Sequence, residues 1–132
     1  MIMDVGELIK REPVKVAPDS SIREACVIMK REGVGSLLVE SGGNPVGFFT
    51  ERDVINAIAN GISLDEKVSS VMTQGVVTIQ ADKDVSEAIL LMNNEGIRHL
   101  VVVDGQGKVI GVISMREAAW ALNSMTLDSS VW

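Results

Sequence analysis

The chain has 132 residues, 46% of them hydrophobic and 23% charged, and this composition is typical of a globular protein with a hydrophobic core rather than of a disordered one. Its 18 acidic and 12 basic residues give a formal net charge of −6, and the basic residues are scattered along the chain, which argues against broad nucleic-acid binding. The single cysteine, Cys26, excludes an internal disulfide and a zinc site built from several cysteines.

The sequence also lacks the features of an exported or membrane-spanning protein. No apolar run approaches the roughly 18 residues that a membrane helix needs. Residues 1–12 acquire charges at once and have no apolar core before a small-residue cleavage site, so they do not resemble a secretory signal. Together with a free thiol, which is typical of a reducing compartment, these features predict a cytoplasmic protein.

The first half of the chain predicts alternating strands and helices. Ser21 and Glu24 have the spacing of a capping box that begins a helix, and Gly33 is suited to end that helix. Between them, apolar residues at i, i+3, i+4 and i+7 form one stripe, and Cys26 on it is expected to be a core residue and not a nucleophile. The predicted elements are a short helix near 4–10, a strand at 14–17, this helix, strands at 36–40 and 46–49 around a turn at 41–45, and a helix from Thr50 to about Asn60.

The second half repeats the first half 63 residues later. Pairs at this spacing include Asp19/Asp82, Glu24/Glu87, Met29/Met92, Gly33/Gly96, Leu37/Leu100 and Val39/Val102. After a one-residue insertion in a loop the spacing becomes 64, which pairs Gly47 with Gly111 and Arg52 with Arg116. The predicted elements are a short helix at 67–72, a strand at 76–79, a helix between the capping box Asp84/Glu87 and Gly96, strands at 98–103 and 109–113 around a turn at 104–107, and a helix from Ser114.

The duplicated order predicts an α+β fold made of two β-α-β-β-α repeats. The first helix of each repeat crosses over between parallel strands, and the hairpin adds an antiparallel strand. Helices on one face of a sheet leave its other face uncovered, so we expect the repeats to pack about a pseudo-twofold axis. The predicted division is a first repeat at 1–60, a connector at 61–66, a second repeat at 67–124 and a C-terminal tail at 125–132.

At this point the pattern resembles a known family. The segments GVGSLLV (33–39) and GIRHLVV (96–102), each followed by a turn and then by GFFTERD (47–53) or GVISMRE (111–117), are similar to a tandem pair of cystathionine β-synthase (CBS) domains, also called a Bateman module. The resemblance implies a regulatory module and not an enzyme. It also implies that an adenosine-containing ligand, AMP, ADP, ATP or S-adenosylmethionine, binds between the repeats, with no required cofactor.

The resemblance further implies a homodimer, and a stand-alone pair would act on a separate effector protein. Two β-α-β-β-α units leave helix faces exposed, and Val131 and Trp132 form an apolar end that favours an interface between two copies. Trp120, on the last predicted helix, fits either the core or this interface.

Two short motifs carry the candidate chemistry. Thr50 with Asp53, and Ser114 with Glu117, each stand where a strand leads into a helix, so they could be capping boxes and nothing more. In the family, the matching hydroxyl and carboxylate also face the ligand, and the carboxylate accepts hydrogen bonds from both ribose hydroxyls. A carboxylate offers paired acceptors to such a diol.

Four basic residues are candidates for binding phosphate. Arg52 and Arg116 stand at the second position of their helices, where the helix dipole disfavours a cation, so either a surface salt bridge or an anionic ligand could explain them. Arg98 and His99 begin the central strand of the second copy, where the first copy has small neutral residues. In the family a basic residue there often reaches phosphate, although a single histidine is also compatible with a packed or capped position.

The family pattern divides these residues between two sites. Site one combines Thr50, Arg52, Asp53, Val77, Thr78, Ile79, Ile97, Arg98 and His99. Site two combines Val14, Lys15, Val16, Val34, Ser114, Arg116 and Glu117. The apolar members could equally be ordinary core residues. Glu117 departs from the aspartate of the family, and its extra methylene could fill the ribose space, which puts site two in doubt.

Other functions have less support. The sequence has no phosphate-binding loop, no dinucleotide-binding glycine motif and no residues at metal-ligand spacing. An assembly module with degenerate pockets, whose role is dimerisation or partner docking, is the alternative to nucleotide sensing, and an enzyme of another kind comes third.

Overall fold

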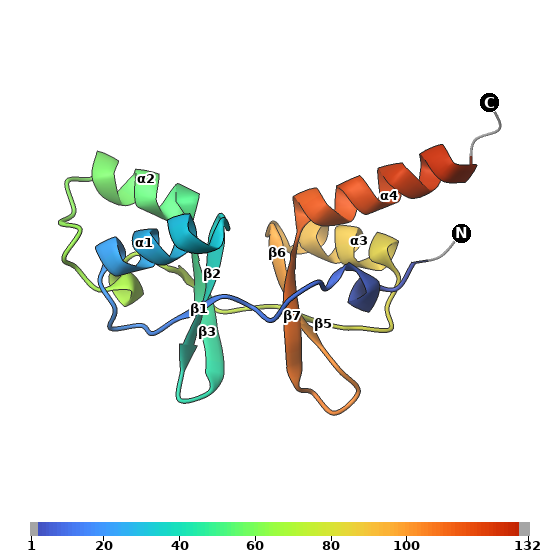
Figure 1. Ribbon diagram of the computed structural model, residues 1–132, viewed down its shortest axis with the longest axis horizontal. Coiled ribbons are helices and arrows are strands. Elements are labelled where there is room, and N and C mark those ends of the chain that lie inside the picture. The colour runs from blue at the N-terminus through green and yellow to red at the C-terminus, as the bar shows by residue number, and fades with distance from the viewer. Residues whose placement is uncertain (1–2, 130–132) are drawn as a thin grey trace. The chain divides into compact units, whose positions relative to one another are not determined.

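The computed structural model describes residues 3–129, and the side chains of residues 3–124. The chain forms two compact units, which we name the continuous unit (Pro13–Val76) and the two-segment unit (Met1–Glu12 with Val77–Trp132). Each unit has a β-sheet with two α-helices, so the predicted α+β class is confirmed (Figure 1). Within the described residues, no helix is long and apolar enough to cross a bilayer.

The continuous unit has a four-stranded sheet in the order β1-β2-β3-β4. Strands β1 and β2 are parallel, and β2–β3 and β3–β4 are antiparallel. The α-helices and a 3-10 helix, η2, pack on one face of this sheet around buried Ile22, Leu37 and Phe49 (Figure 1). The elements are β1 Lys15–Val16, α1 Ile22–Glu32, β2 Ser36–Ser41, β3 Asn44–Thr50, α2 Glu51–Ala59, η2 Val68–Ser70 and β4 Thr73–Gln74.

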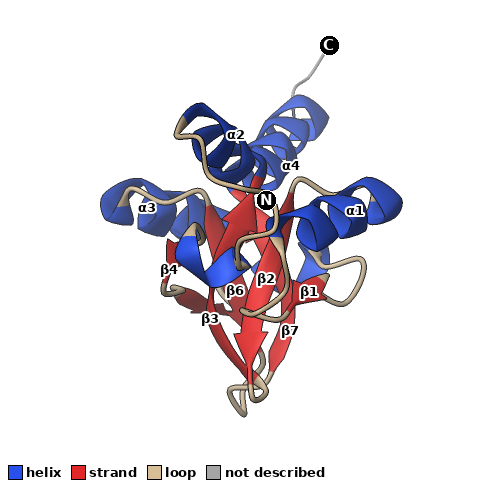
Figure 2. Ribbon diagram, turned by 90° about the vertical axis from the view of Figure 1, so that its left-hand side faces the viewer, coloured by secondary structure: helices blue, strands red, loops and turns tan. Residues whose placement is uncertain are grey.

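The two-segment unit repeats this arrangement with a three-stranded sheet, β5-β6-β7 (Figure 2). Strands β5 and β6 are parallel, β6 and β7 are antiparallel, and the core forms around Val85, Leu100 and Ile113. The elements are η1 Val5–Leu8, β5 Thr78–Gln80, α3 Val85–Glu95, β6 His99–Val103, β7 Val109–Ser114 and α4 Met115–Ser129.

The opening 3-10 helices do not pack with the repeats that they begin in the sequence. Val5 of η1 is 0% exposed in the core of the two-segment unit, and its amide donates to the Lys83 carbonyl at 2.8 Å. Val68 of η2, its repeat counterpart, is 0% exposed in the core of the continuous unit, and its amide donates to the Ser20 carbonyl at 2.8 Å. The compact units therefore differ from the predicted division at 1–60, 61–66 and 67–124, because each opening helix packs against the later strands and helices of the other copy.

Glycines at repeated positions explain part of this packing. Gly33 and Gly96 end α1 and α3 with φ of 67° and 66°, in the left-handed region that favours glycine. Gly47 lies so close to the Thr73 backbone that a Cβ would collide with it. Gly111 lies in the same way against the Ile9 side chain. Glycine at positions 47 and 111 lets the segment after η2 lie along β3, and the segment after η1 lie along β7.

The structure corrects three predicted boundaries. Strand β4 was not predicted, and the turn between β2 and β3 is shorter than 41–45 because both strands extend into that range. The tail predicted at 125–132 is wrong for residues 125–129, which continue α4. The apolar end at Val131 and Trp132 lies outside the described residues.

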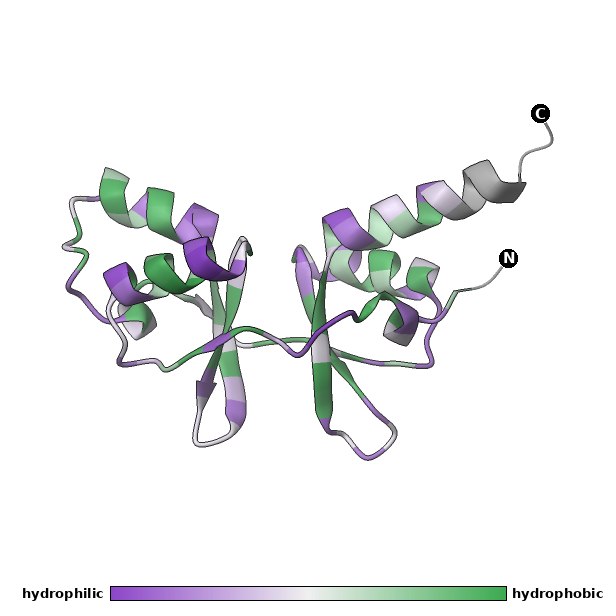
Figure 3. Ribbon diagram, in the orientation of Figure 1, coloured by the Kyte–Doolittle hydropathy of each residue, from purple (hydrophilic) through white to green (hydrophobic). Residues whose placement is uncertain are grey.

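Several large apolar side chains lie exposed on the helices. Figure 3 shows hydrophobic stretches along α2 between hydrophilic ones. Ile55 and Ile58 of α2 are 66% and 61% exposed, and Trp120 of α4 is 69% exposed. Trp120 is therefore not a core residue of its unit, and its place in an interface stays a prediction.

Candidate ligand-binding site

Thr50 and Asp53 form a complete capping box at the start of α2. The Thr50 amide donates to Asp53 Oδ2 at 2.9 Å, and the Asp53 amide donates to Thr50 Oγ1 at 3.3 Å. Thr50 Oγ1 also donates to Asp53 Oδ2 at 3.2 Å. Asp53 is 8% exposed, and among the described residues it is the only buried polar or charged one. The capping role predicted as one of two interpretations is therefore confirmed for this pair.

A third residue contacts the Asp53 carboxylate from strand β4. Thr73 Oγ1 donates to Asp53 Oδ1 at 3.4 Å and to Oδ2 at 3.5 Å. Sequence reasoning missed Thr73, since its repeat counterpart is Lys10 and the duplication gives no signal there. Its position depends on the pairing of β4 with β3, which places Thr73 opposite Phe48.

Ser114 and Glu117 form the matching box in the two-segment unit. The Ser114 amide donates to Glu117 Oε1 at 3.0 Å, and the Glu117 amide donates to Ser114 Oγ at 3.1 Å. Unlike Asp53, Glu117 is exposed. The side chain of Lys10 donates to the Glu7 carbonyl at 3.3 Å rather than to this carboxylate. The two helix starts thus share a cap but differ in the burial of the carboxylate.

The three arginines singled out from the sequence have side chains available to a ligand. Arg52, Arg98 and Arg116 are all exposed. Throughout residues 3–124 none of their guanidinium groups has a hydrogen bond or an ion pair, so the salt bridge considered for Arg52 and Arg116 is absent from the described part. The anionic ligand considered for these arginines stays a prediction.

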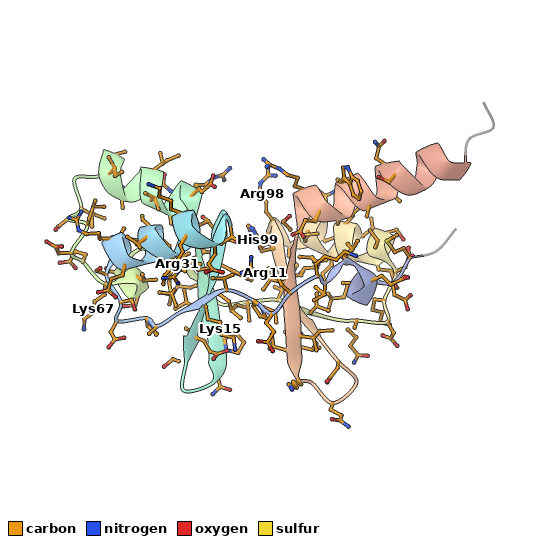
Figure 4. All side chains as sticks on the ribbon, viewed as in Figure 1. Arg11, Lys15, Arg31, Lys67, Arg98 and His99 are labelled. Atoms are coloured by element: carbon orange, nitrogen blue, oxygen red, sulfur yellow. The ribbon has the colours of Figure 1, made fainter. Side chains whose placement is uncertain are left out.

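Arg98 and Arg116 belong to the same end of one sheet. The Arg98 carbonyl accepts from the Met115 amide at 2.8 Å, which ties the start of β6 to the start of α4. His99, half-buried, pairs with Ser114 across β6 and β7. Figure 4 shows Arg98 and His99 at this end of β6. Two basic side chains therefore lie near the start of α4: Arg116 on the helix itself, and Arg98 just before the neighbouring strand β6.

Each of the two predicted sites has some of its residues in one unit and the rest in the other. The continuous unit holds Thr50, Arg52 and Asp53 of site one, and Val14, Lys15, Val16 and Val34 of site two. The two-segment unit holds Val77, Thr78, Ile79, Ile97, Arg98 and His99 of site one, and Ser114, Arg116 and Glu117 of site two. The geometry above is that of each half within its own unit.

The apolar candidates take part in the hydrophobic cores. Val16 and Ile79 are buried in the core clusters of their own units, as ordinary strand residues would be. Val14, Val34, Val77 and Ile97 are half-buried and pack against the edges of those clusters. Lys15 Nζ forms an ion pair with Glu40 Oε2 at 3.3 Å, and Thr78 is exposed on β5.

Other reactive groups are accounted for by the fold. Cys26 is half-buried on α1, and burial raises the pKa of its thiol, which disfavours the thiolate that a nucleophile needs. Residues 3–124 contain no group of three or more histidine, cysteine or carboxylate side chains placed to hold a metal ion.

Comparisons with known proteins identify the family of this chain. A model of the CBS domain family matches residues 5–60 and 68–124. An uncharacterized protein of Methanopyrus kandleri is 36% identical over 87% of this chain and 60% of its own length. A second relative, from Acidianus ambivalens, is 36% identical over 92% of this chain and 74% of its own length.

Solved structures have the same fold. A CBS domain protein from Pyrobaculum aerophilum, crystallised in complex with AMP, superposes with a TM-score of 0.79. The two proteins are 29% identical, and the alignment covers 94% of this chain and 99% of that one. The duplicated pattern, the paired capping boxes and the match of both repeats show that this chain belongs to the CBS domain family.

Proposed function

We propose that the protein is a ligand-sensing regulatory module that binds an adenosine-containing ligand and acts on a separate partner. The observation that carries the proposal is Asp53, a buried carboxylate at a helix start beside Arg52, which has no ion-pair partner in the described part of the chain. The AMP complex of the Pyrobaculum aerophilum protein supports the ligand class.

The chemistry of site one suits such a ligand. A carboxylate is an acceptor for hydroxyl groups, so Asp53 would bind the ribose. Arg52, at the start of α2, would bind phosphate, because a guanidinium donates to two phosphate oxygens and a helix start is positively polarised. Each group then has a distinct part of the ligand to contact, and none of them performs catalysis.

Isothermal titration calorimetry against AMP, ADP, ATP, S-adenosylmethionine and NADH tests the proposal. We expect at least one of AMP, ADP, ATP and S-adenosylmethionine to bind. A bound ligand at 100 times its Kd also raises the free energy of unfolding by about 2.7 kcal/mol, so the Tm provides a second measurement. No heat and no Tm shift with any of the five compounds would refute nucleotide sensing.

The alternative is an assembly module with no ligand, and one observation favours it. Ile55, Ile58 and Trp120 are large apolar side chains exposed on the helices, as expected for the homodimer that the family resemblance implies. We expect light scattering to give the mass of a dimer at micromolar concentration, and Trp120→Lys to weaken it. A monomer would refute the dimer, and a dimer without ligand binding would favour the assembly module.

A further inference from the structure

The Asp53 carboxylate has fewer free acceptor positions than its role at the ribose requires. A carboxylate has about four acceptor positions, two on each oxygen. Oδ2 accepts from the Thr50 amide at 2.9 Å and from Thr50 Oγ1 at 3.2 Å, which fills it. The single Thr73 Oγ1 proton is directed at Oδ1, at 3.4 Å, with Oδ2 at 3.5 Å, and so takes one position on Oδ1. One position is left, whereas a ribose with free 2′ and 3′ hydroxyls donates two hydrogen bonds.

One of the present donors must therefore leave before both hydroxyls can bind. The Thr50 amide belongs to the backbone at the start of α2 and cannot move without loss of the cap. Thr50 Oγ1 is held in place because it also accepts from the Asp53 amide at 3.3 Å. The Thr73 bond is the longest of the three and comes from a side chain on a two-residue edge strand. Rotation of the Thr73 side chain breaks this bond and leaves the β3–β4 pairing intact.

We infer that Thr73 competes with the ribose for Asp53 and thereby sets how strongly the site distinguishes a ribose from a 2′-deoxyribose. This inference rests on the proposed function, since it presumes that Asp53 binds the sugar. A 2′-deoxyribose needs only the one free position, so it binds without displacing Thr73. A ribose gains its second bond only at the cost of the Thr73 bond, which reduces the advantage of the 2′ hydroxyl.

The competition is confined to the continuous unit. In the two-segment unit, no side-chain hydroxyl of the described residues donates to the Glu117 carboxylate, which accepts from the Ser114 amide. The residue at the position equivalent to Thr73 is Lys10, whose side chain donates to the Glu7 carbonyl. The two halves that derive from one duplicated pattern thus differ in sugar discrimination as well as in the length of the acidic side chain.

Calorimetry with AMP and 2′-deoxy-AMP on the parent protein and on Thr73→Val tests the inference. Valine has nearly the shape of threonine but no hydroxyl, so it frees the second position on Oδ1. In Thr73→Val we expect the Kd of 2′-deoxy-AMP divided by the Kd of AMP to rise by about threefold to tenfold, the range for one modest hydrogen bond. The rise comes mainly from tighter AMP binding. Thr73→Ser keeps the hydroxyl and is expected to keep the parent ratio.

The outcomes separate the inference from the function on which it rests. Binding of AMP with an unchanged ratio in Thr73→Val, or with weaker AMP binding, overturns the competition while nucleotide sensing stands. No binding of either nucleotide by any variant overturns the inference, and nucleotide sensing falls with it if ADP, ATP, S-adenosylmethionine and NADH also fail to bind. Thr73→Ala also lacks the hydroxyl and repeats the measurement if Thr73→Val does not fold, and a Tm for each variant shows which proteins are folded.

Discussion

The Thr50 amide donates to Asp53 Oδ2 at 2.9 Å while the Asp53 amide donates back to Thr50 Oγ1 at 3.3 Å. This reciprocal pair satisfies two amides at the start of α2 that would otherwise have no partner within the helix. The carboxylate that we propose binds the ribose is thus already oriented by the fold before any ligand arrives. Preorganisation of this kind lowers the entropy that binding must overcome.

Asp53→Asn separates the two roles of this side chain. Asparagine keeps an oxygen that accepts from the Thr50 amide, so we expect the free energy of unfolding to fall by only about 1 kcal/mol or less. It replaces a charged acceptor for the ribose with a donor, which is expected to weaken every adenosine ligand by about 1.5–3 kcal/mol. Thermal unfolding and calorimetry measure the two effects. If the variant bound AMP as tightly as the parent, Asp53 would have a capping role alone, and the assembly module would be favoured.

Glu117→Asp is expected to strengthen site two. Aspartate can form the same capping box that Asp53 forms, and its shorter side chain clears the space that the extra methylene of Glu117 would occupy. We expect a second binding event in calorimetry, with the first event unchanged. Glu117→Gln is the matched control, since it keeps the length and removes the charge. A second event in both variants, or in neither, would contradict the steric explanation.

Val5→Ala and Val68→Ala are a matched pair that tests whether each opening 3-10 helix packs against the other copy of the repeat, an arrangement that we call the exchange of the opening helices. Each valine is fully buried, so the loss of two methyl groups should destabilise its unit by about 1.5–3 kcal/mol. We expect Val5→Ala to raise hydrogen exchange in residues 77–124, and Val68→Ala to raise it in residues 13–76. Faster exchange of each variant in the opposite unit would show that the opening helices pack as the repeat boundaries of the sequence suggest.

Asp84 links stability to pH through the N-cap of α3. A hydrogen bond from Ser86 Oγ is the largest of the effects that hold the pKa of Asp84 below its usual 3.8, and the amides of Ser86 and Met3 add to it. Because the folded pKa is the lower one, the stabilisation is complete above about pH 4 and is lost as pH falls through the folded value. We expect Asp84→Asn to destabilise the protein at pH 7 and the difference from the parent to shrink below pH 4. Unfolding by urea at a series of pH values measures both. A difference that grew on acidification would mean that folding raises the pKa of Asp84 instead of lowering it.

Local patterns in the sequence predicted local structure well. The capping boxes Asp84/Glu87 and Thr50/Asp53 and the glycine end at Gly96 depend on residues within one turn, so their spacing was sufficient. Strand β4 has two exposed residues and exists because β3 lies beside it, so no periodicity could reveal it. The exchange of η1 and η2 is also non-local, since a repeat pattern does not state which copy an opening helix packs against.

The candidate site was predictable to a similar degree. The residue types at 50–53 and 114–117 revealed the hydroxyl, carboxylate and arginine positions. The burial of Asp53 and the exposure of Glu117 were not predictable, because burial depends on what packs over a helix start and not on the motif itself. Thr73 was missed for the same reason. Its contact with Asp53 joins residues that are distant in sequence and is brought about by β4 pairing.

The exchange of the opening helices also constrains the order in which the protein can fold during synthesis. The continuous unit is a single stretch of chain and can fold as soon as it has left the ribosome. Met3 and Val5 emerge before it, yet their backbone partners at Val85 and Lys83 are made only afterwards. Met3 and Val5 therefore stay without these partners while an entire unit is made. Their docking closes a long loop, since Met3 and its partner Asp84 are 81 residues apart, and we expect it to be a slow step.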